Sequence, residues 1–304
     1  MKILQNQITS YLSANFSESE TAWSASPTVF NYGNEIRDGH FIYKYAGSDA
    51  TNTTDTPSID YLKLATERKW IKTRPTNYFA MLDNETQTQT ENTESIIITI
   101  ATSNFDALSL LGLYAKDITI ELTDNTTSEI VYTKNIDLID TKAIIDFSTY
   151  AFNENQLLPS MYVDDIPLYV DGTLSITINN SGDTAKCGRL VCGRTYYIGD
   201  TGYGINLGQE SYSTKETDVF GNTTLIHSNS LNLDSYEVNV PTNAIPNIRR
   251  RFKELDAVSI LFIMDEKENS NLENLLNFGY YQSFNILIPN SVISTASLQI
   301  KGIL

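Results

Sequence analysis

The sequence has few of the residues on which most catalytic and metal sites depend. Its 304 residues include only two cysteines and two histidines, which excludes a disulfide framework and leaves too few ligands for a Cys/His zinc site. No run of residues approaches the roughly 18 apolar residues that a membrane helix needs. The residues after Met1 also form no continuous apolar signal core. We therefore expect a protein that is made in a cytoplasm and does not insert into a membrane.

Positive charge is also scarce. Lysine and arginine number 21 against 37 aspartates and glutamates, which gives a formal net charge of −16. Because such a surface repels phosphate backbones, we expect no nucleic-acid partner. Hydrophobic residues nevertheless make up 41% of the chain, as in globular proteins, and the length suits one large or two medium domains.

Long helical patterns are rare, and the periodicity predicts strands instead. Residues 95–101 are apolar and β-branched, as in a strand buried on both faces. Residues 117–124 and 130–138 are predicted to form an antiparallel hairpin. Further strand candidates are residues 107–115, 142–152, 165–180 and 188–199. Their spacing of about ten residues, with turns between, predicts an antiparallel β-sandwich or jelly roll.

The pattern changes near residue 208. Ile248, Phe252 and Leu255 share one face of a predicted helix over 246–257, with Pro246 in its first turn. Strands are predicted at 233–240, 258–264, 284–289 and 297–303, and a short helical turn at 271–278. This order predicts a small α+β unit. The predicted division is an N-terminal arm over 1–22, a β-sandwich domain over 23–208 and a small α+β domain over 209–304.

The stretch CGRLVCGRTYYIGDTGYGINLG (187–208) holds both cysteines and six of the 15 glycines. Cys187 and Cys192 lie five residues apart in one predicted strand, so we expect their side chains on opposite faces, as buried free thiols. GDTGYG (199–204) lacks the dinucleotide-binding fingerprint, and no helical pattern follows it. We interpret it as an irregular bend where backbone approaches backbone, the alternative being a loop that contacts a sugar or a neighbouring subunit.

Catalysis has little support in the sequence. A Ser-His-Asp or Cys-His site would need His40 or His227, and neither lies near a GxSxG elbow. Glycoside hydrolysis would depend on the abundance of carboxylates alone. Loops 124–129 and 164–172 offer oxygen ligands, which leaves structural calcium open. We predict a protein that is not an enzyme, with no cofactor.

Aromatic residues favour a binding role. The chain has 18 tyrosines, 12 phenylalanines and two tryptophans, and tyrosine-rich surfaces suit protein interfaces and carbohydrate stacking equally well. The sole basic run is predicted on the solvent face of the helix, either solvated or as a clamp for carboxylates of a neighbouring copy. The candidate interface or sugar-contact residues are Trp23, Trp70, Tyr196, Tyr197, Tyr203, Arg249, Arg250 and Arg251.

Several stretches resemble a group of tailed-bacteriophage virion proteins. They are TRPTNYFAMLD (73–83), CGRLVCG (187–193), YGINLGQESYS (203–213), DVFGNTTLIHS (218–228) and LNFGYYQSFNILIPNSVISTASLQIKGI (276–303). The resemblance implies a tail, baseplate or neck component with a galactose-binding-like β-sandwich. It also implies a homo-oligomeric ring in the virion tail, in contact with other tail proteins. A carbohydrate-binding module that recognises a host surface glycan is the alternative.

Overall fold

The computed structural model describes residues 1–24, 30–47, 56–102, 104–139, 157–202, 205–264 and 275–303. In these residues the chain is mainly β. Every pairing between two named strands is antiparallel. The prediction of a mainly β, antiparallel protein is therefore confirmed. The predicted strand at 142–152 lies outside the described residues.

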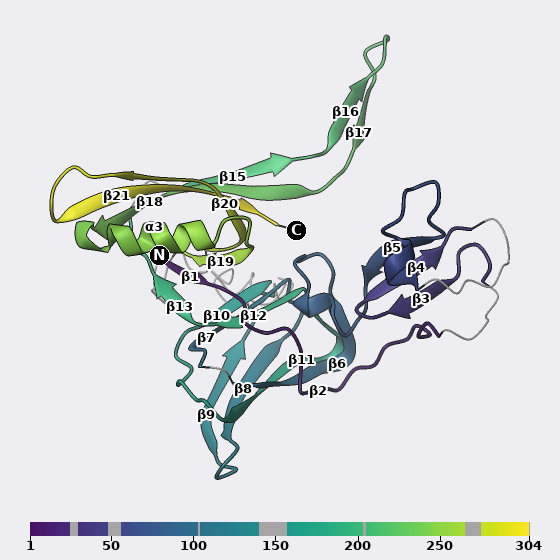
Figure 1. Ribbon diagram of the computed structural model, residues 1–304, viewed down its shortest axis with the longest axis horizontal. Helices are drawn as coiled ribbons and strands as arrows, with labels where there is room; N and C mark the ends of the chain where they lie inside the picture. The colour runs from purple at the N-terminus through teal and green to yellow at the C-terminus, as the bar shows by residue number, and fades with distance from the viewer. Residues whose placement is uncertain are drawn as a thin grey trace, which may run out of the picture.

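Two of the sheets pack face to face (Figure 1). The five-stranded sheet has the order β2 (Ser13–Ala14), β6 (Thr90–Ala101), β11 (Gly172–Cys187), β8 (Asp117–Asp124) and β9 (Ile130–Asp137). The three-stranded sheet has the order β10 (Ser160–Val163), β7 (Ala107–Leu111) and β12 (Arg189–Gly193). Side chains from both sheets form one continuous core, an arrangement consistent with a β-sandwich.

Alternation along the strands explains this core. In β8, Ile118, Ile120 and Leu122 are fully buried while the residues between them are partly exposed, as a sheet with one covered face requires. The expectation that residues 95–101 are buried on both faces is wrong, because Ile97 is 38% exposed. It lies on the outer face of the sheet, opposite to the buried Ile96 and Ile98.

An eight-stranded sheet covers the other side of the three-stranded sheet. Its order is β13 (Thr195–Tyr197), β1 (Lys2–Leu4), β19 (Ile260–Ile263), β20 (Leu276–Leu287), β21 (Ile293–Gly302), β18 (Ser230–Pro241) and β14 (Asp200–Thr201), with β15 (Asn206–Ser211) also paired to β18. Leu4, Val191 and Phe278 belong to the core between the two sheets. The three-stranded sheet is therefore a middle layer, buried on both faces.

Helix α3 (Ile245–Glu254) covers the far face of the eight-stranded sheet. Ile248, Phe252 and Leu255 are buried there, as their spacing predicts. The Phe252 ring stacks on Phe284 at a centroid distance of 4.0 Å. A single 3₁₀ turn, η2 (Thr242–Ala244), precedes the helix. Of the helical turn predicted at 271–278, residues 271–274 lie outside the described residues, and strand β20 begins at Leu276.

The sheets cross the predicted domain boundaries. β1 lies inside the eight-stranded sheet, paired with β13 and β19, so residues 2–4 are not part of a free arm. β13, β14 and β15 precede or span residue 208, yet they belong to the same sheet as the C-terminal strands. These pairings join segments far apart in the chain, which local sequence patterns do not encode. The three-part domain division stays a prediction.

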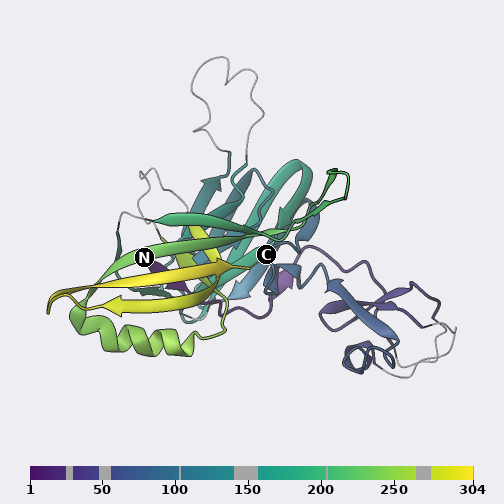
Figure 2. The same cartoon turned by 90° about the horizontal axis from the view of Figure 1, so that it is seen from above.

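A small sheet stands apart from the other layers in both views (Figures 1 and 2). It consists of β3 (Glu35–Asp38), β4 (Phe41–Tyr45) and β5 (Trp70–Pro75), with the short helix α1 (Pro57–Asp60) beside them. Its own core is mostly aromatic, built on Phe30, Ile36, Tyr43, Tyr45 and Trp70. A 3₁₀ turn, η1 (Ala80–Leu82), follows where the chain returns to the sandwich.

Candidate interaction surfaces

A two-stranded ribbon projects from the eight-stranded sheet (Figure 1). It continues β15 and β18 through β16 (Thr214–Thr217) and β17 (Thr223–Ile226), whose eight residues are all exposed. Two strands without a core are marginally stable in water. At the base of the ribbon, the Lys301 ammonium donates to the Tyr212 hydroxyl at 2.6 Å and pairs with Glu210. The ribbon is therefore fastened at its base and uncovered along its length.

The tip of the ribbon is an ordered turn that presents two apolar side chains. The Asp218 carboxylate accepts hydrogen bonds from the backbone N–H groups of Phe220 at 2.9 Å and Asn222 at 2.8 Å. It also accepts one from the Asn222 side-chain amide, and these bonds lower the pKa of Asp218. Gly221 takes the left-handed conformation, φ +85°, that the turn requires. Val219 and Phe220 are held 94% and 87% exposed.

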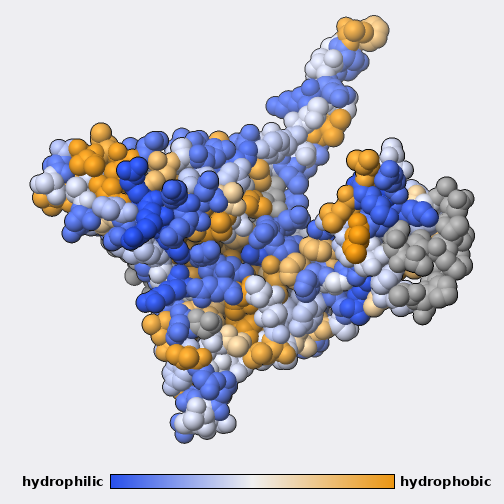
Figure 3. All heavy atoms as spheres, viewed as in Figure 1, coloured by the Kyte–Doolittle hydropathy of each residue, from blue (hydrophilic) through white to orange (hydrophobic). Residues whose placement is uncertain are grey.

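A second apolar surface lies at the turn between β20 and β21. We call it the end patch; its residues Leu287, Ile288, Val292 and Ile293 are between 51% and 71% exposed. The Asn290 side-chain carbonyl accepts the backbone N–H groups of Val292 and Ile293, which orders the turn. Figure 3 shows apolar surface both at this end of the molecule and at the tip of the ribbon.

The structure separates the aromatic residues proposed as a contact platform. Trp70 is fully buried in the aromatic core of the small sheet, so the suggestion that it contacts a sugar or partner is corrected. Trp23 is half-buried against the same core, and Tyr196 packs against the core beneath α3. Tyr197 is 50% exposed. Tyr203 lies outside the described residues.

The three arginines of α3 do not act as one group. Arg249 and Arg250 are exposed, as predicted, and Arg250 donates to the Asn247 side chain at 2.8 Å. Arg251 is half-buried, however, and donates to the Gln5 side chain at 3.1 Å. It also pairs with Glu254 at 3.3 Å. Arg251 therefore binds its own chain, and only Arg249 and Arg250 face solvent.

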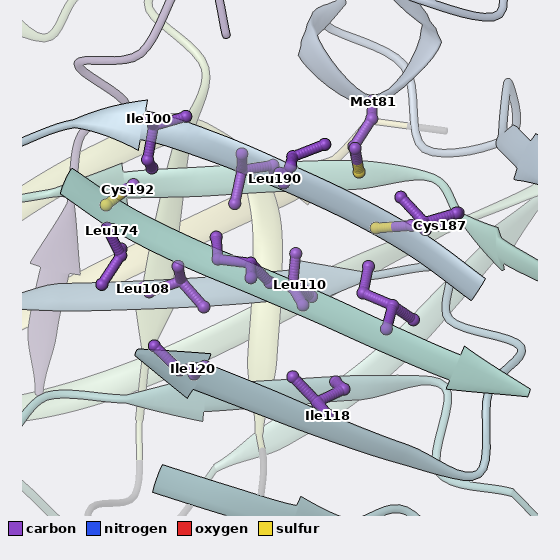
Figure 4. Packing of buried hydrophobic residues seen from close by; sticks show 14 of the residues in the cluster. Met81, Ile100, Leu108, Leu110, Ile118, Ile120, Leu174, Cys187, Leu190 and Cys192 are labelled. Atoms are coloured by element: carbon purple, nitrogen blue, oxygen red, sulfur yellow. The ribbon is translucent and has the colours of Figure 1, made fainter. Parts of the chain in front are cut away.

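The two cysteines reach the same core. Both are free and buried, as expected, but they do not point to opposite faces (Figure 4). Cys187 ends β11 in the five-stranded sheet, and Cys192 lies in β12 of the three-stranded sheet. The chain crosses between the sheets at Gly188, where a Cβ atom would lie 2.3 Å from the Thr86 carbonyl oxygen. Burial raises the pKa of Cys187 to about 12 and also raises that of Cys192.

The structure also places the candidate catalytic histidines and the candidate calcium loops. His40 is exposed and stacks on Phe79 at a centroid distance of 4.3 Å, and His227 is exposed. The two candidate calcium loops meet, since the Asn125 amide donates to Asp171 at 2.8 Å. Within the part of the chain that the structure describes, no three His, Cys, Asp or Glu side chains are grouped so that they could hold a metal ion.

No described helix has both the length and the apolar character to span a membrane.

Comparison of the chain with family models, curated proteins and solved structures gave no match in any of the three. The ribbon tip and the end patch are surfaces that the sequence analysis missed. The only local signal for the tip is Asp218 followed by Gly221 and Asn222, which is typical of a turn. The apolar pair inside that turn is the unusual feature.

Proposed function

We propose that this chain is a structural component of a tailed-bacteriophage virion, made in the host cytoplasm and placed in the tail, baseplate or neck. It acts through protein–protein contacts in a symmetric assembly, without catalysis. Two features support this proposal: the resemblance of the quoted stretches, and the five- and three-stranded sheets, which would form the galactose-binding-like jelly roll. The strands after residue 208, with α3, would form the trailing α+β module.

The observation that carries the proposal is the ribbon tip. Val219 and Phe220 are almost completely exposed, and burial of such side chains is worth about 1.5–3 kcal/mol each. An ordered turn that holds both side chains in water does not gain this stabilisation unless another chain covers them. Exposed apolar patches that a fold maintains in this way mark interaction sites. We therefore assign the tip to a contact with another chain.

The end patch supplies the complementary surface. In the register of β18 and β21, Pro241 lies opposite Ile293, which belongs to the end patch. The ribbon leaves β18 at the other end, at Ser230. The two apolar surfaces thus lie at opposite ends of one sheet, as Figure 1 shows. A contact between two different surfaces of identical chains is head-to-tail, and it closes into a ring when the rotation allows.

Sedimentation of the purified protein tests this proposal. The paired substitution Val219→Ser with Phe220→Ser removes the apolar tip without touching a core. Val170→Ser is the matched control, because Val170 is 76% exposed and lies far along the chain in a loop. We expect concentration-dependent oligomers for the parent and the control, and at least a hundredfold weaker association for the tip variant. A parent that stays monomeric at every concentration would contradict the proposal.

The carbohydrate-binding alternative receives no comparable support. Of its proposed platform residues, Trp70 is buried and Tyr197 is half-exposed and bound through its hydroxyl to Asp200. Binding of a glycan by a multimeric form of the protein would revive it.

A further inference from the structure

A cavity of about 360 Å³ lies where three segments of the chain converge. The segment after β1 supplies Gln5, Asn6, Ile8 and Thr9. The region of η1 supplies Phe79, Leu82 and Asn84, and the loop after α3 supplies Ala257, Val258 and Ser259. This volume suits a small organic molecule rather than a folded partner. Its lining combines apolar side chains with amide and hydroxyl groups.

Arg189 forms the charged part of this cavity. It opens β12, where alternate residues face opposite layers: Leu190 belongs to the sandwich core and Val191 to the core shared with the eight-stranded sheet. Arg189 lies on the Val191 side and is only 3% exposed. Its guanidinium carbon lies 5.0 Å from the centre of the Phe278 ring. The sequence therefore places a permanent cation inside the molecule.

The guanidinium is poorly satisfied by the chain itself. Its Nε and Nη1 atoms are buried and have no hydrogen-bond partner. Nη2 makes one long contact, 3.4 Å, to the Asn84 side-chain oxygen. Within the described ranges, no carboxylate lies within 4.0 Å of Arg189. A buried cation with unused donors costs several kcal/mol unless an anion or other acceptor completes it.

The nearest countercharge does not complete it. Asp83 interacts with Arg189 only at longer range, and its two oxygens are already used. One accepts the Glu85 backbone N–H at 2.8 Å and the other the Thr88 hydroxyl at 2.7 Å. Burial also raises the pKa of the Asp83 carboxyl above its ordinary value. The Tyr11 hydroxyl is buried and has no hydrogen-bond partner as well.

We propose that this cavity binds a small organic monocarboxylate. The carboxylate pairs with the Arg189 guanidinium, whose planar donors match it, after the side chain turns toward the cavity that it lines, because Nε and Nη1 have almost no exposed surface in the unliganded chain. The apolar body lies against Phe79, Leu82 and Val258. A single negative charge fits better than a phosphate dianion, because the site offers one cation and the chain carries a net charge of −16. The site is independent of the ribbon tip and of the proposed assembly.

Ligand-observed NMR and thermal shifts on the full chain test the proposal, with benzoate, hexanoate and glucuronate as carboxylate probes and inorganic phosphate as the comparison. We expect at least one carboxylate to bind with a dissociation constant below about 10 mM, and phosphate to bind at least tenfold more weakly. No carboxylate binding in this range overturns the proposal. Phosphate binding as tightly as the best carboxylate overturns the ligand class.

Three variants locate the binding. Arg189→Met removes the cation and should weaken binding of the best carboxylate at least tenfold. Ser259→Trp fills the cavity from its half-buried rim and should block binding while Arg189 stays in place. Arg250→Met removes an exposed guanidinium from α3 and should change nothing. Unchanged binding in Ser259→Trp or Arg189→Met overturns the assignment, and if Arg189→Met does not fold, the Ser259→Trp result decides alone.

Discussion

The layered fold depends on β1, and Leu4 is the residue that tests this most sharply. Leu4 has no exposed surface, and it packs in the core between the three-stranded and eight-stranded sheets. Truncation of a fully buried leucine to alanine removes its transfer free energy and leaves a cavity, at a cost of about 3–5 kcal/mol. We therefore expect Leu4→Ala to lower the free energy of unfolding by about 3 kcal/mol or more.

Urea unfolding measures this effect, and Leu12→Ala is its control. Leu12 lies in the same N-terminal segment but is 61% exposed, so its truncation should change the free energy of unfolding by no more than about 0.5 kcal/mol. If residues 1–22 formed an arm that mattered only for assembly, both variants would unfold like the parent. Equal, small effects of the two substitutions would therefore refute the three-layer packing described above.

Two further predictions concern the buried stretch around β12. At Gly193, an added Cβ atom would lie 2.1 Å from the Gln5 carbonyl oxygen, so Gly193→Ala should lower the melting temperature by several degrees. Gly202→Ala, where the nearest atom would be 3.4 Å away, should have a far smaller effect; equal melting temperatures would contradict the close approach. Cys187, with its pKa raised from 9.0 to about 12, should not react with a thiol reagent at pH 8 until the protein unfolds. Because the unfolded thiol ionises first, this cysteine should reduce stability progressively between pH 9 and pH 12, and that loss should be smaller in Cys187→Ser.

Elements with a strong local pattern were predictable. The hydrophobic alternation over 117–124 matches β8, and the helix predicted at 246–257 corresponds to α3 at Ile245–Glu254. In both elements, apolar residues recur at the spacing that places them on one face of the strand or helix. The burial of Ile248, Phe252 and Leu255 follows from the same repeat.

Features that depend on distant contacts were not predictable. β1 pairs with β19, although the two strands lie far apart in the chain, and no local sequence pattern predicts this pairing. The cysteines share one core because the chain changes sheets at Gly188, whereas the sequence alone suggested an uninterrupted strand. The burial of Trp70 and of Arg189 likewise depends on distant contacts that the local sequence does not predict. Trp70 is a candidate contact residue in the sequence but is buried, and nothing in the residues around Arg189 indicates that its charge lies inside the molecule.

The interaction surfaces could be predicted only in part. Asp218, Gly221 and Asn222 predict a turn, but the exposure of the two apolar residues within it becomes visible only when the ribbon stands clear of every sheet. The end patch has the same explanation. Its aliphatic residues lie at the ends of β20 and β21 and in the turn between them, and their exposure follows from how the sheet is covered rather than from the local sequence.

Cross-linking from the ribbon tip tests the central claim most directly. A photoreactive phenylalanine analogue at position 220 should join the tip to a peptide within residues 276–302 of a second copy, at protein concentrations where oligomers form. The same analogue at position 170 should give no such product. Cross-links from position 220 that stay within one chain, or that reach a second copy only outside the β20–β21 region, would contradict the head-to-tail contact.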